Sequence, residues 1–215
     1  MNVFKNLKAE KYCKRDILIM TADFLRNLLA YSYRKIIFAK IGKNVRISRR
    51  AKIFGAGKIV IGNNVVIEDD VLINANSPSS NCIVLGDHCV IKKGTLIESY
   101  GGKIEIGSNC SFNPYCVIYG HGGLHVGNDV RVATGAVIIP ANHIFEDKNT
   151  PITKQGIKTK GISIGNDVWI GANVTILDGV KIGDSTVVGA GAVVTKNAAS
   201  HCVYAGVPAK LVRER

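Results

Sequence analysis

The stretch IGNDVWIGANVTILDGVKIGDSTVVGAGAV, residues 164–193, returns an aliphatic residue at every sixth position. The same template starts again at Ile61, Leu85, Ile106 and Val126, and a looser version starts at Ile41. A period of six fits neither the 3.6-residue turn of a helix nor the simple alternation of one strand. We therefore expect the chain to turn every six residues.

Short strands joined by such turns can wind into coils. Gly-Asn and Gly-Asp pairs recur at the expected corners, where glycine accepts a positive φ and asparagine tolerates one. Three strands and three corners make one coil, and stacked coils form three parallel sheets around a column of inward Ile and Val. The sequence thus predicts a mainly β protein, a parallel β-helix over residues 41–215.

The six cysteines are dispersed and include no CxxC pair, so we expect reduced thiols and no zinc site built from cysteine. Cys89, Cys110 and Cys116 occupy the small inward position of the template, where Val65 and Val130 stand in other coils. A buried free cysteine behaves as a small hydrophobe. These three residues are predicted to pack in the core.

One interval between coil starts is much longer than the others and contains IIPANHIFEDKNTPITKQG, residues 138–156. We expect an excursion over residues 140–161 that leaves the coils and carries His143. The bare surface of a β-helix is flat, so a projecting loop is needed to make a pocket. The tail, residues 200–215, is expected to end the same domain.

The net charge of +12 is concentrated at one end of the sequence. Residues 1–60 hold 15 Lys and Arg against three acids, whereas the other 155 residues hold 13 of each sign. Residues 1–40 also have apolar side chains at helical spacing, so we expect a basic helical segment there. It is expected to pack on the first coil or on a neighbour, with an anionic membrane surface as the alternative.

No apolar run reaches the ~20 residues that a spanning helix needs. The start of the sequence also lacks the apolar centre of a signal peptide. We expect a cytoplasmic protein, with peripheral contact to the inner face of the membrane as an option. Because the charge is local, nucleic acid is not expected as a partner.

The repeat, with DVWIGANVTILDGVKIGDSTVVGAGAVVTKN (167–197) and AGVPAKLVRER (205–215), resembles the hexapeptide-repeat acyltransferases. It is most similar to the sugar O-acetyltransferases of the galactoside, maltose and surface-polysaccharide type. The resemblance implies a left-handed β-helix and a homotrimer with acetyl-CoA bound at each subunit interface. It also implies a saccharide acceptor, in surface polysaccharide or glycolipid biosynthesis, and no metal.

In this family a long excursion carries a catalytic histidine to the subunit boundary, and His143 matches it. The chemistry agrees, because a sugar hydroxyl is a weak nucleophile and attack on a thioester is helped by removing its proton. Imidazole, with an ordinary pKa of about 6.5, is largely neutral near pH 7 and can accept that proton. Glu146 or Asp147 could orient the ring, and the sequence does not choose between them.

Two further residues match acceptor-side positions of the family. Asn113 lies thirty residues before His143, the separation of an acceptor-binding asparagine in the galactoside enzymes. Trp169 sits at an outward position and matches the tryptophan that flanks the pantetheine arm near the acceptor pocket. The resemblance therefore implies that Trp169 contacts both acceptor and cofactor.

The remaining matches concern the cofactor. Ala172 and Ala190 match positions whose backbone groups hydrogen-bond the pantetheine amides. Lys196, Lys210 and Arg213 match basic positions near the nucleotide phosphates, and phosphate attracts such cations.

Other functions stay open at this stage. N-acetylation of a nucleotide-linked amino sugar is the nearest, but that subgroup often has a nucleotide-binding domain before the coils, so hydroxyl acceptors are favoured. Serine acetyltransferase would require a long helical N-terminal domain. A carbonic-anhydrase-like zinc enzyme would use three histidines, for which His88, His121 and His125 are candidates. A non-catalytic scaffold would only present the coils as a binding surface.

Overall fold

The computed structural model describes residues 36–215, and residues Phe38–Arg215 form one compact unit. The expected N-terminal helical segment, residues 1–40, lies almost entirely outside the described residues. No helix within residues 36–215 is long and apolar enough to cross a membrane.

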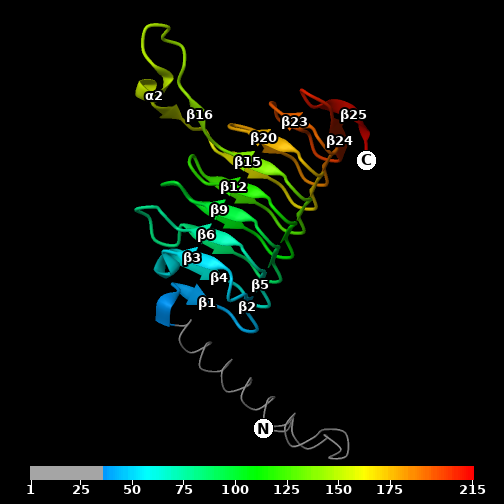
Figure 1. Ribbon diagram of the computed structural model, residues 1–215. Helices are drawn as coiled ribbons and strands as arrows, with labels where there is room; N and C mark the ends of the chain where they lie inside the picture. Colours follow the sequence, from blue (N-terminus) through cyan, green and yellow to red (C-terminus); the bar gives the residue numbers. More distant parts are fainter. Residues whose placement is uncertain (1–35) are drawn as a thin grey trace, which may run out of the picture. The chain divides into compact units, whose positions relative to one another are not determined.

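Three sheets run the length of this unit (Figure 1). Sheet A contains seven strands: β1 (Lys40–Ile41), β4 (Ile59–Ile61), β7 (Ile83–Leu85), β10 (Ile104–Ile106), β13 (Leu124–Val126), β18 (Ile162–Ile164) and β21 (Lys181–Ile182). Sheet B contains nine strands: β2 (Arg46–Ile47), β5 (Val66–Ile67), β8 (Val90–Ile91), β11 (Ser111–Phe112), β14 (Arg131–Val132), β19 (Trp169–Ile170), β22 (Val187–Val188), β24 (Cys202–Ala205) and β25 (Lys210–Glu214). Sheet C contains seven strands: β3 (Lys52–Phe54), β6 (Leu72–Asn74), β9 (Leu96–Glu98), β12 (Val117–Tyr119), β15 (Val137–Ile139), β20 (Thr175–Leu177) and β23 (Val193–Val194).

The chain visits sheets A, B and C in turn, so each coil adds one strand to each sheet. Within the sheets neighbouring strands are parallel, apart from the antiparallel pair of β24 and β25 at the C-terminal end. A short 3-10 helix, η2 (Ala56–Lys58), stands between β3 and β4. The structure confirms the predicted fold, a left-handed parallel β-helix.

The core is the predicted column of aliphatic side chains. Ile61, Ile106 and Ile164, which begin repeats in the sequence, are at most 2% exposed. Cys89 and Cys116 are fully buried, as their position in the template predicts. Each thiol donates to a backbone carbonyl of the next coil, and burial raises the pKa of Cys116 to about 11.

The expected positive φ is found at some corner glycines, for example 67° at Gly94 and 68° at Gly135, but not at the glycines of the Gly-Asn and Gly-Asp pairs. The positive φ falls two residues later, for example 57° at Asn64 and 60° at His88. A Cβ at Gly86 would instead lie 2.6 Å from both the carbonyl carbon and the oxygen of Gly107 in the next coil. Glycine is therefore required there because the coils stack too closely for a side chain, and not because of its freedom in φ.

Polar side chains tie the corners between sheets A and B together. The carboxylate of Asp87 accepts a hydrogen bond from the backbone N–H of Asn63 at 2.7 Å. Asn166 and Asp184 repeat this contact higher in the stack, with 2.6 Å from the Asn166 N–H to the carboxylate. Each such bond satisfies an exposed backbone donor, which stabilises the stacking of one coil on the next.

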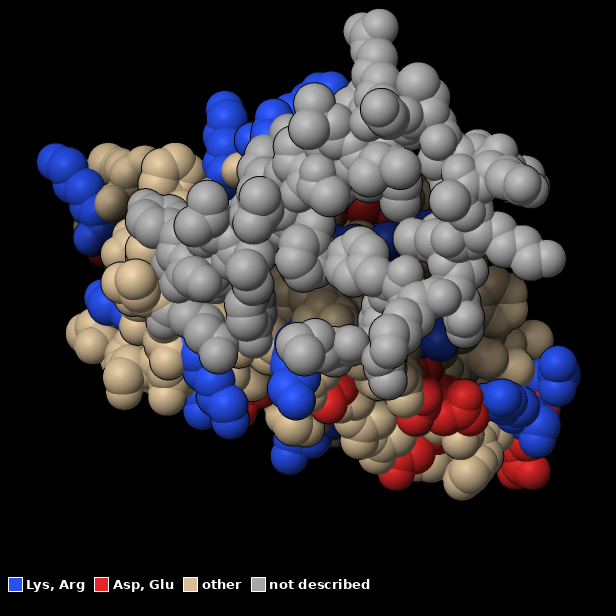
Figure 2. Space-filling view, turned by 90° about the horizontal axis from the view of Figure 1, so that it is seen from below, with Lys and Arg blue, Asp and Glu red and all other residues tan. Residues whose placement is uncertain are grey.

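Charges of both signs lie on the end of the unit that β1 begins. Seen from that end, Lys and Arg are spread around the view, and Asp and Glu gather mainly at one edge (Figure 2). Arg50, for example, is paired with Asp70 at 2.6 Å and lies 3.9 Å from Asp69. Part of the basic charge of residues 36–60 is thus neutralised by the next coil.

The excursion over residues 140–161 forms an arm. It leaves the coils after β15 and returns before β18, and it contains β16 (Asn142–His143), α2 (Ile152–Gln155) and β17 (Ile157–Lys158). β16 and β17 pair antiparallel, with His143 opposite Ile157. Figure 1 shows the arm projecting from one side of the stack, with β24 and β25 on the other side.

Candidate active site

A hollow of about 340 Å³ lies on the outer face of sheet B, beside Trp169. The indole is 57% exposed. The strand register places five side chains in one outward row across this hollow: Arg131, Trp169, Val187, Val203 and Arg213. A large aromatic surface thus lies between two guanidinium groups.

The rim of this hollow carries more charge. Arg215 pairs with Asp167 at 2.8 Å. Hydrogen bonds from Ser185 and then from Arg215 lower the pKa of Asp167. The lining holds Arg131, Arg213 and Arg215 against Asp129 and Asp167, so the hollow has an excess of positive charge that suits phosphate.

The edge where sheet B turns into sheet C, called edge BC below, follows the C-terminal ends of the strands that carry Arg131, Trp169 and Val187. Ala172 and Ala190 occupy equivalent positions on it in consecutive coils, and the Ala172 carbonyl accepts a hydrogen bond from the Gly191 N–H at 2.8 Å. Lys210 pairs with Ala205 at the end of the same edge. Small residues leave the backbone of this edge accessible to an extended ligand.

Asn113 lies on edge BC too, further from the C-terminal end. Both its backbone N–H and its side-chain Nδ2 donate to the Val132 carbonyl, at 2.9 and 3.0 Å. The side-chain amide of Asn113 therefore stabilises the corner through its Nδ2, and its Oδ1 takes no part in that bond. The amide can satisfy the turn and still accept a hydrogen bond from a ligand.

His143 and Lys196 lie elsewhere. The arm with His143 leaves from the edge where sheet C turns into sheet A, called edge CA below, and the His143 side chain is exposed. Lys196 follows β23 on edge CA and is also exposed. The structure thus brings six of the eight predicted residues to sheet B and edge BC and places the other two on edge CA.

Known proteins share the repeat of this chain. Residues 161–196 match the profile described as bacterial transferase hexapeptide (six repeats), and residues 64–99 match that of the hexapeptide repeat of succinyl-transferase. The "Putative lipopolysaccharide biosynthesis O-acetyl transferase WbbJ" of Escherichia coli K12 is 31% identical over 140 residues, covering 61% of this chain and 71% of that protein. The chain belongs to the hexapeptide-repeat acyltransferase family.

Other similar proteins differ in the share of the chain that their match covers. The galactoside O-acetyltransferase of Escherichia coli K12 is 38% identical over 117 residues, which are 54% of this chain and 56% of that protein. The match therefore spans little more than half of that relative. AntD, an N-acyltransferase from Bacillus cereus solved with dTDP and 3-hydroxybutyryl-CoA, has a TM-score of 0.60 and 27% identity, covering 86% of this chain and 88% of that chain.

The AntD match bears on one argument made from the sequence. Hydroxyl acceptors were favoured because N-acyltransferases of this family often carry a separate domain before the coils. AntD is an N-acyltransferase and the match covers 88% of its chain, so the argument from a separate domain does not distinguish the two reactions.

Within this acyltransferase, the two carboxylates that could orient His143 have partners inside the arm. Glu146 pairs with Lys158 at 2.6 Å, and this bond lowers the pKa of Glu146. Asp147 accepts from the Thr150 hydroxyl at 2.6 Å, which lowers the pKa of Asp147. Both residues stabilise the shape of the arm.

Sequence reasoning missed two residues. Arg131 shares the outward row with Trp169, and its register could have been found by aligning the sixth positions of the repeats. Asp178 lies at the base of the arm, where its carboxylate accepts from the backbone N–H of Lys160 and of Gly161 at 2.8 and 2.9 Å. The Asp-Gly pair in ILDGVK was the available signal for a corner acceptor.

The three candidate zinc ligands do not form a cluster in the chain. Among residues 36–215, no group of three or more His, Cys, Asp or Glu side chains is placed to hold a metal ion. Burial lowers the pKa of His121, whose ring stacks on Tyr100 with centroids 4.5 Å apart. His125 is exposed on the outer face of sheet A.

Proposed function

We propose that this acyltransferase transfers the acetyl group of acetyl-CoA to a hydroxyl of a saccharide. The observation that carries the proposal is the row with Trp169 between Arg131 and Arg213, next to the small residues of edge BC. Relatives named as O-acetyltransferases support the hydroxyl acceptor, and the acyl-CoA bound to AntD supports the donor. Surface polysaccharide or glycolipid assembly is the proposed setting.

The proposed cofactor site uses both faces of edge BC. The pantetheine arm runs along Ala172 and Ala190, where the small side chains allow close approach to backbone groups. Trp169 flanks that arm, and Arg213 and Lys210 meet the phosphates. Lys196, which lies on edge CA, reaches the phosphates from a neighbouring subunit. An extended ligand suits this part of the edge, because Ala172 and Ala190 place no large side chain at its corners.

His143 is the proposed general base. Its imidazole takes the proton of the acceptor hydroxyl as that oxygen attacks the thioester carbonyl, and then passes the proton to the departing CoA thiolate. The side-chain oxygen of Asn113 accepts a hydrogen bond from an acceptor hydroxyl, since its Nδ2 is engaged by Val132. A backbone N–H is the proposed donor to the oxyanion.

The proposal requires a second copy of the chain, because His143 lies on edge CA and Trp169 lies on the outer face of sheet B of one subunit. We propose a homotrimer in which the arm of one subunit reaches edge BC of the next. The outer face of sheet C supports this assembly, because it carries a half-buried row in strand register that is apolar except for Thr175: Leu72, Leu96, Val117, Val137, Thr175 and Val193. Such a ladder is typical of a surface that packs against another subunit.

The test is replacement of His143 by alanine. We expect kcat to fall ~10²–10⁴-fold, the usual contribution of positioned proton transfer, while the Kd for acetyl-CoA stays unchanged. A free-thiol assay with a panel of sugars gives kcat, and calorimetry gives Kd. His88→Asn is the matched control, because His88 is exposed on another edge and asparagine tolerates its φ of 60°. Wild-type turnover in His143→Ala would rule out the mechanism.

One alternative acceptor has a specific observation in its favour. AntD is an N-acyltransferase and has been solved with dTDP-4-amino-4,6-dideoxyglucose, so an amino group on a nucleotide-linked sugar is the second candidate. The product distinguishes the two reactions, because hydroxylamine cleaves an acetyl ester and leaves an acetamide intact. A product resistant to hydroxylamine would replace the hydroxyl acceptor by the amine.

A further inference from the structure

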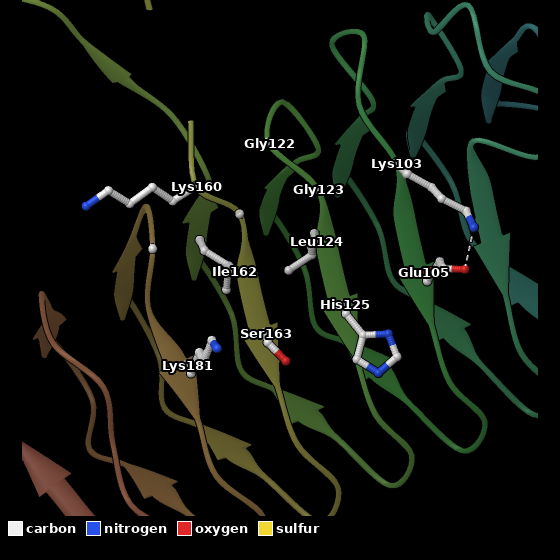
Figure 3. Close-up of a pocket in the computed structure, with 12 residues that line it drawn as sticks. Lys103, Glu105, Gly122, Gly123, Leu124, His125, Lys160, Ile162, Ser163 and Lys181 are labelled. Atoms are coloured by element: carbon white, nitrogen blue, oxygen red, sulfur yellow. Dashed lines mark ion pairs between the residues drawn. The ribbon is translucent and has the colours of Figure 1, made fainter. Parts of the chain in front are cut away.

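A second hollow, of about 480 Å³, lies on the outer face of sheet A (Figure 3). Its floor is a row of side chains in strand register: Glu105 on β10, His125 on β13, Ser163 on β18 and Lys181 on β21. Figure 3 shows His125, Ser163 and Lys181 side by side on adjacent strands. None of these residues belongs to the Trp169 groove, which lies on sheet B.

The hollow has an excess of positive charge. Its one lining carboxylate, Glu105, is paired with Lys103 at 2.6 Å. Lys160 and Lys181 also line it, and within residues 36–215 neither forms an ion pair. The ammonium group of Lys181 therefore remains in the row, together with the Ser163 hydroxyl and the His125 imidazole as hydrogen-bond donors. Lys160 supplies a second ammonium group at the border of the hollow, where its side chain extends away from the row in Figure 3.

These donors suit a phosphate group. The lysine ammonium is a compact point charge that binds phosphate from any direction, and serine and histidine add directed hydrogen bonds. The residues that line the hollow include no Phe, Tyr or Trp on which a nucleobase could stack. The volume exceeds that of one phosphate, so a diphosphate fits as well.

The hollow also adjoins the arm. Lys160 is the last residue but one of the excursion, and its side chain lies over Gly179, where a Cβ would be 3.1 Å from it. Ile157, the strand partner of His143, precedes Lys160 by three residues. An extended chain rises at most ~3.6 Å per residue, so the Cα atoms of Lys160 and His143 lie within roughly 16 Å of each other.

We propose that the hollow on sheet A binds the phosphate group of the acceptor. This inference rests on the proposed function and narrows its substrate to saccharides that carry a phosphate or diphosphate. One such acceptor spans the distance from the hollow to the arm, so its phosphate is held by Lys181, Ser163 and Lys160 while its sugar lies toward His143. The cofactor phosphates stay in the groove on sheet B.

The first experiment is a calorimetric titration of the full chain with inorganic pyrophosphate. We expect saturable binding, weakened about tenfold in Lys181→Gln, because one charge-assisted hydrogen bond is lost. Lys40→Gln is the matched control, since Lys40 occupies the same outward row of sheet A six strands away, at roughly 29 Å. Thermal melts of both variants check that the fold is intact.

The result that overturns the proposal is absence of saturable binding, or equal weakening in Lys181→Gln and Lys40→Gln. The proposal would also be overturned if CoA displaced all of the pyrophosphate and if Arg213→Gln weakened pyrophosphate binding as much as Lys181→Gln. The site would then be the cofactor groove. This titration needs no acetyl transfer, so its failure is distinct from failure of the proposed function.

A second pair of titrations identifies the source of the phosphate. A nucleoside diphosphate that binds more tightly than pyrophosphate indicates a nucleotide-linked sugar, whereas tighter binding of a short-chain prenyl diphosphate indicates a lipid-linked one. In kinetics, Lys181→Gln should raise KM for a phosphorylated sugar about tenfold and leave KM for the same sugar without phosphate unchanged. An equal effect on both sugars would overturn the role in acceptor binding.

Discussion

The carboxylate of Asp178 accepts hydrogen bonds from the backbone N–H of Lys160 at 2.8 and 3.0 Å, and this contact closes the base of the arm that carries His143. The arm has its own hairpin and hydrogen bonds, but it meets the coils at its two ends. Asp178 thus links the position of His143, the proposed general base, to the rigid stack of coils.

Replacement of Asp178 by alanine should lower kcat roughly 10- to 100-fold, because a shift of about 1 Å at a reacting group has effects of that order. The Kd for acetyl-CoA should stay the same, since the groove on sheet B is not touched. Steady-state kinetics and calorimetry measure the two quantities. Asp184→Ala removes an equivalent corner bond, from Asn166 at 2.6 Å, away from the arm and is the control. Equal kcat losses in both variants would mean that general destabilisation explains the effect.

Replacement of Trp169 by alanine should weaken acetyl-CoA binding about tenfold, which corresponds to about 1.4 kcal/mol. The exposed indole has no packing role that explains its presence within one chain, so its loss should leave the melting temperature nearly unchanged. Trp169→Phe should retain most of the affinity because it keeps an aromatic face. Calorimetric titration with CoA provides the comparison, and unchanged affinity in Trp169→Ala would remove the residue from the cofactor site.

Replacement of Gly86 by alanine should destabilise the stack by about 1–3 kcal/mol, the usual cost of forcing extra atoms into a packed site. The new Cβ would meet the backbone of Gly107 at 2.6 Å, and backbone cannot rotate away. Gly191→Ala is the control, because Gly191 has a φ of 71° but nothing within 4 Å of an added Cβ. Urea unfolding should show the larger loss for Gly86→Ala. A larger loss of stability in Gly191→Ala would mean that the freedom of glycine in φ matters more than the close stacking of the coils.

The bond between Asp87 and Asn63 predicts a pH dependence. Hydrogen bonds from the Asn63 backbone and then from its side chain lower the pKa of Asp87. A lowered pKa in the folded state means that the carboxylate contributes stability above the ordinary pKa of about 3.9, and that this contribution is lost as the pH falls through the folded value. Thermal melts of the wild type and Asp87→Asn should therefore differ at pH 7 and converge below pH ~3. A constant difference at all pH values would contradict this origin.

The repeat determines the coil because its period is local. Once an aliphatic residue returns every sixth position, only a chain that turns at each repeat can bury all of these side chains, and the positions of Ile61, Ile106 and Cys89 follow from the template. The exposed Trp169 and the long excursion with His143 could be identified in the same way, as departures from the pattern.

Relations between coils depend on the tertiary structure, because insertions of different length separate the repeats in the sequence. Stacking decided that Gly86 is needed for close approach, that Arg131 and Arg213 flank the row containing Trp169, and that Asp178 holds the arm. It also aligned His125, Ser163 and Lys181 on one face of sheet A. Such contacts join residues as distant in the sequence as Asp167 and Arg215, 48 positions apart. Their register follows from hydrogen bonding between the coils, which local sequence does not encode.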